Sequence, residues 1–149
     1  MREKQTARSS IPPAAAVRAV AAGAAVLTVA AGLGVRTAGG GEAAKYAGDA
    51  LYTVLIHTLV VLAVPRTRPR AAAGAALALS WAVELAQLTG VPERLAAHST
   101  LARLVLGSTF NAPDLLWYAV GAASAGALHT ALAAGSRAPG GPIPSKGGL

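Results

Sequence analysis

The chain has 149 residues, enough for one domain, and 54% of them are hydrophobic while only 13% are charged. Soluble domains carry about 25% charged residues, so this composition argues against an ordinary soluble fold and indicates lipid as the solvent. The 13 Lys and Arg outnumber the 6 Asp and Glu, but the basic residues separate apolar blocks instead of forming one polar face, which argues against nucleic acid as a partner.

Four apolar blocks follow in chain order, each near the ~20 residues that cross ~30 Å of hydrocarbon as a helix. The predicted spans are residues 14–35, 46–64, 71–89 and 113–134. A basic leader precedes them at residues 1–13, and a Gly- and Pro-rich tail at residues 135–149 is predicted to be disordered. The expected fold class is therefore an all-α, polytopic transmembrane helix bundle with four spans.

The first block has an alternative interpretation as a cleaved signal peptide, because a basic start precedes it. Its apolar stretch is longer than a usual signal core and its cleavage signal is poor. We therefore expect it to be retained as a span.

The distribution of cations predicts the orientation of the bundle. Four spans with a cytoplasmic N-terminus would place nine cations inside: Arg2, Lys4, Arg8, Arg18, Arg66, Arg68, Arg70, Arg137 and Lys146. The same topology would place four outside: Arg36, Lys45, Arg94 and Arg103. This bias follows the positive-inside rule, so both termini are predicted to be cytoplasmic.

The segment between the third and fourth predicted spans, residues 90–112, is long enough for structure of its own. It mixes apolar and basic side chains: Leu95, Leu101, Leu104, Val105, Arg94, His98 and Arg103. The pattern is typical of an interfacial amphipathic helix. An irregular surface loop is the alternative.

Several polar residues fall toward the predicted outer face. Asp49 lies early in the second span, Glu84 and Gln87 lie late in the third, and Asp114 opens the fourth. A carboxylate in hydrocarbon costs a few kcal/mol and is usually turned into the bundle toward a partner. Each aspartate has a hydroxyl on its own helix face, from Tyr52 and Tyr118 respectively, and Arg103 lies in the adjacent outer loop. The candidate binding residues are Asp49, Tyr52, Glu84, Gln87, Arg103, Asp114 and Tyr118.

Structural roles remain open for each of these residues. Asp49 and Asp114 lie near predicted helix starts and could serve as capping groups. Tyr118 fits an interfacial aromatic belt, and Glu84 could form a purely structural pair with Arg103 or Tyr52.

Neither the spacing of the histidines nor any recognisable motif predicts a catalytic or metal site. His57, near the middle of the second span, could relay protons with Glu84 or be a hydrogen-bonded structural residue. With His98 and His129 it shares no metal-ligand spacing, so no metal site is expected. No recognisable catalytic or cofactor motif is present, and with no cysteine there is no thiolate nucleophile. We therefore predict no cofactor and no catalytic residue.

The order of motifs resembles domain-of-unknown-function family 2809, a group of small bacterial membrane proteins. The matching segments are Lys45-Tyr46-x-Gly48-Asp49-Ala50-Leu51-Tyr52, Glu84-Leu85-x-Gln87-Leu88, Leu104-x-Leu106-Gly107-x-x-Phe110 and Asp114-Leu115-x-x-Tyr118-x-x-Gly121. The resemblance implies a bundle of four to five helices in the bacterial inner membrane and no settled activity. A looser likeness is to VanZ-type membrane proteins, and it transfers no role to any residue.

The leading hypothesis is a non-enzymatic membrane protein that binds an envelope lipid or a cell-wall precursor headgroup at an outer-side polar site. Carboxylates and tyrosines can hydrogen-bond to sugar hydroxyls or ammonium groups. The alternatives are a small proton-coupled transporter, an enzyme acting on a lipid-linked substrate, and a structural or accessory subunit without a ligand. The expected partners are the bilayer and that ligand, and a homo-oligomer is compatible with the sequence.

Overall fold

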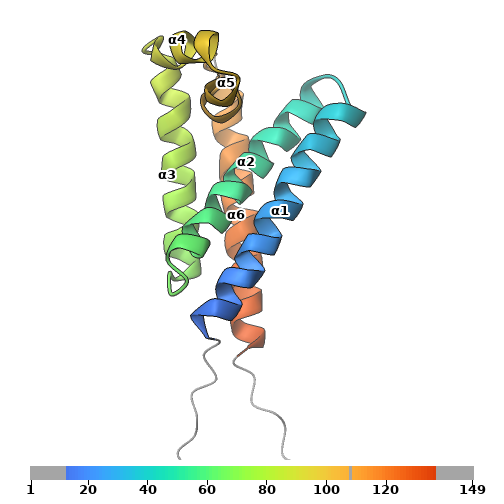
Figure 1. Cartoon of the computed structure of the whole chain (residues 1–149), viewed down its shortest axis with the longest axis vertical. Helices are drawn as coiled ribbons and strands as arrows, with labels where there is room; N and C mark the ends of the chain where they lie inside the picture. The colour runs from blue at the N-terminus through green and yellow to red at the C-terminus, as the bar shows by residue number, and fades with distance from the viewer. Residues whose placement is uncertain (1–12, 108, 137–149) are drawn as a thin grey trace, which may run out of the picture.

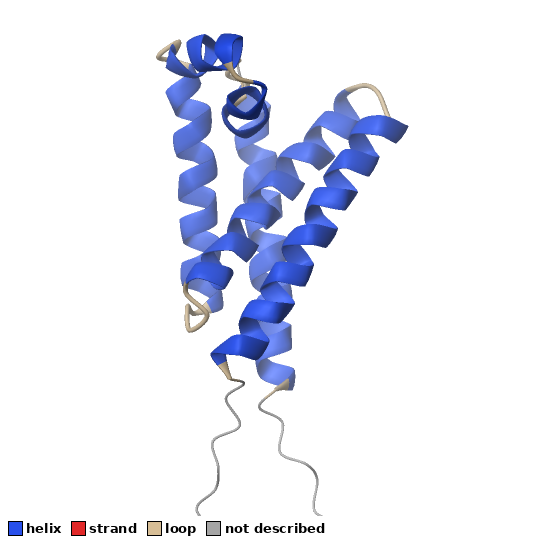
Figure 2. Cartoon of the chain, viewed as in Figure 1, coloured by secondary structure: helices blue, strands red, loops and turns tan. Residues whose placement is uncertain are grey.

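The structure is a computed structural model that describes residues 13–107 and 109–136, and all regular secondary structure within them is helical (Figure 2). The helices are α1 (Ala14–Ala38), α2 (Glu42–Ala63), α3 (Pro69–Gln87), α4 (Val91–His98), α5 (Thr100–Leu106) and α6 (Ala112–Gly135). The predicted all-α class is confirmed. The predicted leader and tail lie outside the described residues, apart from Pro13, Gly135 and Ser136.

Four long helices form a bundle in which α2 is central (Figure 1). Helix α2 contacts α1, α3 and α6, and α3 also packs on α6. The start of α1, the α2–α3 turn and the end of α6 lie at one end, below called the basic end because it carries Arg18, Arg66, Arg68 and Arg70 (Figure 1). The α1–α2 connection, α4 and α5 lie at the opposite end, below called the cleft end.

The bundle is alanine-rich and polar inside and apolar outside. Its largest fully buried side chains are polar: Glu84, Thr53 and Ser80. Most of its buried apolar residues are alanines, such as Ala72 and Ala76. The long helices expose many large apolar side chains, among them Val20, Val26, Leu27, Leu79, Leu116 and Leu128. Soluble proteins bury such residues, whereas a lipid-solvated bundle exposes them and packs through small residues. The distribution is that expected of a membrane-embedded protein.

Within residues 13–107 and 109–136, three helices are long and apolar enough to cross a membrane: α1, α2 and α6. A fourth candidate span exists only if α3 is taken together with α4, and these two meet at an angle of 87°. The sequence predicts residues 71–89 to be the third of four ordinary spans. Helix α3 is less apolar because it carries Ser80, Glu84 and Gln87 among its alanines.

Glycine and proline set the helix boundaries near the predicted ones. Gly41 has φ 90°, a conformation that favours glycine, and α2 begins directly after it at Glu42, four residues earlier than predicted. Pro69 begins α3, where its missing N–H costs nothing. At the basic end, Arg18 Nε donates to the Leu62 carbonyl at 3.2 Å, which satisfies a terminal carbonyl of α2.

The segment between α3 and α6 forms two short helices, α4 and α5, where the sequence favoured one amphipathic helix or an irregular loop. The irregular loop is therefore wrong, and the predicted helical segment is divided into two helices. Ser99 separates the helices in an extended conformation, and its hydroxyl accepts a hydrogen bond from the Ala102 N–H at 3.2 Å. Ser99 thus acts as the N-cap of α5, a role that serine fills well. Placement of these helices at a membrane interface stays a prediction.

Candidate polar site

The site is built on one face of α2 where it meets α3 and α6. Lys45, Asp49, Thr53 and His57 follow one another at four-residue intervals, so they form a polar stripe along a single face of α2. Each residue of the stripe forms a polar contact with α3 or α6 or with its neighbour on α2.

Lys45 joins the two aspartates at the cleft end. Its Nζ lies 3.3 Å from Asp49 Oδ2, one helical turn away, and also forms an ion pair with Asp114 Oδ1 on α6. The Asn111 side-chain amide also donates to Asp114 Oδ1, at 2.5 Å. Asp114 is buried, whereas nearly half of the Lys45 side chain is exposed. Lys45 was not predicted as a site residue, although its four-residue spacing from Asp49 is a recognisable ion-pair signal.

The capping interpretation does not hold for Asp49. Because α2 begins at Glu42, Asp49 lies two turns inside the helix and cannot reach the free N–H groups at its start. Asp114 does lie in the first turn of α6, where a carboxylate meets the positive end of the helix dipole.

Glu84 is fully buried and both of its carboxyl oxygens accept hydrogen bonds. Oε1 accepts from the Asn111 backbone N–H at 2.6 Å, and Oε2 accepts from the Tyr118 hydroxyl at 2.9 Å. The expected structural partners were Arg103 or Tyr52, and the structure corrects this. Tyr118 is also buried within the bundle, so it does not belong to an aromatic belt.

Tyr52 and Gln87 hold the end of α5 over the site. The Tyr52 hydroxyl donates to the Val105 carbonyl at 2.9 Å, and Gln87 Nε2 donates to the Leu106 carbonyl at 2.8 Å. Gly107, with φ 66°, then turns the chain toward α6, and a Cβ there would collide with the Gln87 amide. These bonds fix α5 to α2 and α3 at the free carbonyls of its C-terminus.

An open cleft of about 620 Å³ lies between the cleft-end parts of α1 and α2 and the end of α5. Its polar lining includes Arg36, Lys45, Asp49, Tyr52 and Gln87, and its apolar lining includes Val29, Leu33, Leu51, Leu55 and Leu104. A cleft with both kinds of lining can accommodate a polar group and an attached hydrocarbon.

The structure brings together six of the seven predicted site residues through the contacts above. Four of these six line the cleft: Asp49, Tyr52, Gln87 and Tyr118. Asp114 and Glu84 lie behind the lining, where Asp114 contacts Lys45 and Glu84 accepts a hydrogen bond from Tyr118. Arg103 is the exception: its side chain is exposed on α5 and makes no ion pair or hydrogen bond with another described residue.

Two further polar pairs lie deeper in the bundle. Thr53 Oγ1 and Ser80 Oγ form a hydrogen bond of 2.9 Å, and both residues are fully buried. His57 Nε2 lies 3.2 Å from His129 Nδ1, and His57 Nδ1 is buried without a partner among the described residues. His57 therefore pairs with His129 and not with Glu84. Within residues 13–107 and 109–136, no three His, Asp or Glu side chains come close enough to share a metal ion.

Comparison with known proteins gives one match. A family model described as "Protein of unknown function (DUF2809)" matches residues 40–122, which include every site residue from Lys45 to Tyr118. This confirms the resemblance predicted from the sequence motifs, while the looser likeness to VanZ-type proteins stays a prediction. No curated protein and no solved structure matches the chain.

Proposed function

The chain belongs to the DUF2809 family of proteins of unknown function, and from this premise we propose that it binds the headgroup of an envelope lipid or cell-wall precursor in the cleft. The observation that carries the proposal is the mixed lining of the cleft, which combines Lys45, Asp49 and Tyr52 with apolar residues. Such a lining suits an amphiphile, because a headgroup can bind the polar residues while its hydrocarbon remains in an apolar environment.

The proposal includes a topology of four spans in the inner membrane of a bacterium, with both termini in the cytoplasm. The basic end of the bundle carries four arginines and no acidic residue among the described residues, and this supports a cytoplasmic location for that end. The cleft would then open toward the outer face. A non-enzymatic role agrees with a site whose buried carboxylates, Glu84 and Asp114, are already engaged in hydrogen bonds.

Native mass spectrometry of the full chain, released gently from detergent, tests the proposal. Asp49→Asn is the informative variant, because Asp49 lines the cleft, whereas Glu84 and Asp114 are buried in the bundle. Glu93→Gln, at an exposed carboxylate on α4 that does not line the cleft, is the matched control. We expect a selective lipid adduct in the wild-type chain and the control, with about tenfold lower occupancy in Asp49→Asn, since one charge-assisted hydrogen bond is worth roughly that factor.

Two results would contradict the proposal. One is a wild-type chain that carries no selective adduct from a total lipid extract. The other is an adduct of equal occupancy in Asp49→Asn and Glu93→Gln while both variants keep the helical content of the wild type.

A small proton-coupled transporter is the second candidate, and the deep polar pairs favour it. The stripe on α2 continues from the cleft through Thr53 to His57, which contacts His129. Vesicles that contain the reconstituted protein and a pH-sensitive dye would report proton movement. A transporter requires proton flux that His57→Phe reduces, whereas equal flux in protein-free vesicles would exclude this candidate.

A further inference from the structure

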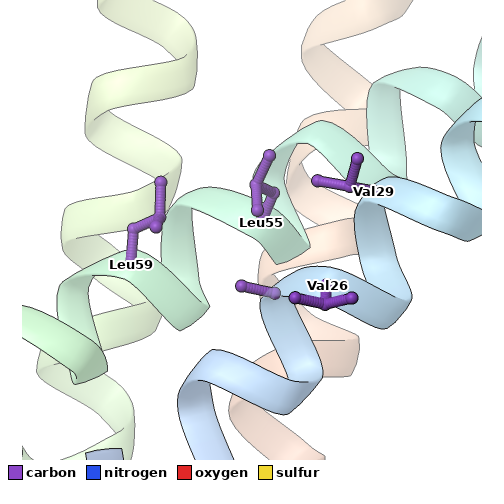
Figure 3. A pocket seen from close by; sticks show the side chains of 5 residues that line it. Val26, Val29, Leu55 and Leu59 are labelled. Atoms are coloured by element: carbon purple, nitrogen blue, oxygen red, sulfur yellow. The ribbon is translucent and has the colours of Figure 1, made fainter.

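An apolar groove runs along the surface of α1 and α2 below the cleft (Figure 3). It has a volume of about 420 Å³ and is lined by Ala25, Val26 and Val29 of α1 and by Leu55 and Leu59 of α2, with no polar surface. Figure 3 shows the labelled valines on one helix and the labelled leucines on the other. The small side chain of Ala25 leaves room between these larger ones.

The groove is continuous with the cleft. Val29 and Leu55 line both, so the polar lining at the cleft end passes directly into the apolar lining of the groove. Along α1, Arg36 and Val26 are ten residue steps apart, which corresponds to roughly 15 Å at 1.5 Å per residue. That length is about half of a ~30 Å hydrocarbon core, which is the depth of one leaflet.

The unpaired charge among the described residues that line the cleft is the guanidinium of Arg36. Lys45 is engaged by Asp49 and Asp114, so this cluster of one cation and two carboxylates has no unpaired cation. Arg36 also lines the cleft, and its guanidinium makes no ion pair or hydrogen bond with another described residue. A guanidinium offers paired N–H donors that match the geometry of a phosphate group.

We infer that the ligand of this site is a phosphate-bearing membrane lipid, with its phosphate at Arg36 beside Lys45 and one hydrocarbon chain in the groove between α1 and α2. This inference rests on the proposed function and names the class of ligand. Asp49 and Tyr52 then face the polar part of the headgroup beyond the phosphate, where they can exchange hydrogen bonds with hydroxyl groups.

Three probes separate the contributions of phosphate and chain. They are phosphatidylglycerol, diacylglycerol with the same chains but no phosphate, and glycerophosphoglycerol, which has the phosphate but no chains. Each is added to the purified full chain, and its occupancy is measured by native mass spectrometry. We expect phosphatidylglycerol to exceed each of the other two by about tenfold or more, because diacylglycerol lacks the phosphate and the headgroup beyond it, and glycerophosphoglycerol lacks the chains.

Two variants with controls locate the binding. Arg36→Gln should lower the preference for phosphatidylglycerol over diacylglycerol by about tenfold, while Arg103→Gln, at an exposed cation outside the cleft lining, should preserve it. Val26→Trp should fill the groove and lower phosphatidylglycerol occupancy about tenfold. Val20→Trp is the control, because it makes the same change on α1 outside the groove. Val20 is 63% exposed and Val26 is 69% exposed, and the control should leave phosphatidylglycerol occupancy unchanged.

The outcomes distinguish this inference from the proposed function. If Asp49→Asn reduces lipid binding but Arg36→Gln and Val26→Trp do not, the headgroup site stands and the phosphate and groove assignments are overturned. If diacylglycerol binds as well as phosphatidylglycerol, the phosphate assignment is wrong. If no cleft or groove variant alters lipid occupancy, both the inference and the proposed function fail.

Discussion

Glu84 shows how a single acidic residue can be accommodated inside an apolar bundle. It is 1% exposed, and an unpaired carboxyl group at such a position would lose its hydration without compensation. The Asn111 N–H and the Tyr118 hydroxyl each occupy one of its oxygens. The residue therefore links α3 to the start and to the second turn of α6, and its first role is to hold these helices together.

Tyr118→Phe should destabilise the bundle because it removes one of these hydrogen bonds and leaves Glu84 Oε2 unpaired. We expect a loss of about 1–3 kcal/mol, the range for a buried group that loses its partner. Thermal unfolding in detergent, followed by circular dichroism, measures the change. Tyr46→Phe is the control, because the Tyr46 ring stacks on Trp117 but its hydroxyl has no hydrogen bond to another described residue. Equal melting temperatures for the two variants would show that the Tyr118 bond is not stabilising.

At the scale of whole helices, α2 and α6 approach each other closely because Gly121 has no side chain. A Cβ at this position would overlap the backbone of Ala50. Close approach through a small residue is a common way for membrane helices to pack. It also brings the polar stripe of α2 within reach of Asp114 and His129, so the site depends on this contact.

Gly121→Ala should force α2 and α6 apart and destabilise the protein. The overlap is with backbone, which cannot move away as a flexible side chain could, and overpacking of this kind costs about 1–3 kcal/mol. Gly23→Ala on α1 is the control, because a Cβ there meets nothing within 4 Å. The same unfolding measurement should give a lower melting temperature for Gly121→Ala alone. A melting temperature at or above the wild-type value would contradict the close contact.

At the scale of the whole molecule, the two ends of the bundle differ in charge. Among the described residues, all the charged side chains at the basic end are arginines, whereas the cleft end carries both cations and carboxylates. The polar residues that line the cleft also lie at the cleft end. Thr37 lies at the cleft end and Thr67 lies in the turn at the basic end, and each hydroxyl donates to a carbonyl three residues earlier. These two threonines offer matched positions for a test of orientation.

The chain contains no cysteine, so Thr37→Cys and Thr67→Cys each introduce a single thiol. Because cations favour the cytoplasmic side, we expect a membrane-impermeant maleimide to label Thr37→Cys on intact cells. It should label Thr67→Cys only after the cells are permeabilised. Labelling of Thr67→Cys on intact cells, with protection of Thr37→Cys, would invert the topology and place the cleft in the cytoplasm.

The amino-acid sequence by itself predicted the helical class, the approximate bounds of the long helices and most of the polar residues that meet at the cleft end. These features depend on local periodicity, on glycine and proline, and on the preference of side chains for lipid or water. The break at Ser99 was missed because apolar spacing alone does not reveal an N-cap within an amphipathic segment.

Only the tertiary structure decided which polar groups are partners. It paired Glu84 with Tyr118 instead of Arg103 or Tyr52, and it paired His57 with His129, 72 residues apart in the chain. It also placed Lys45 between two aspartates. The cleft and the groove beside α1 likewise exist only because of how the helices pack. These contacts depend on the rotation and crossing of whole helices, which are set by packing such as that of Gly121 on α2, and the sequence of one helix does not specify them.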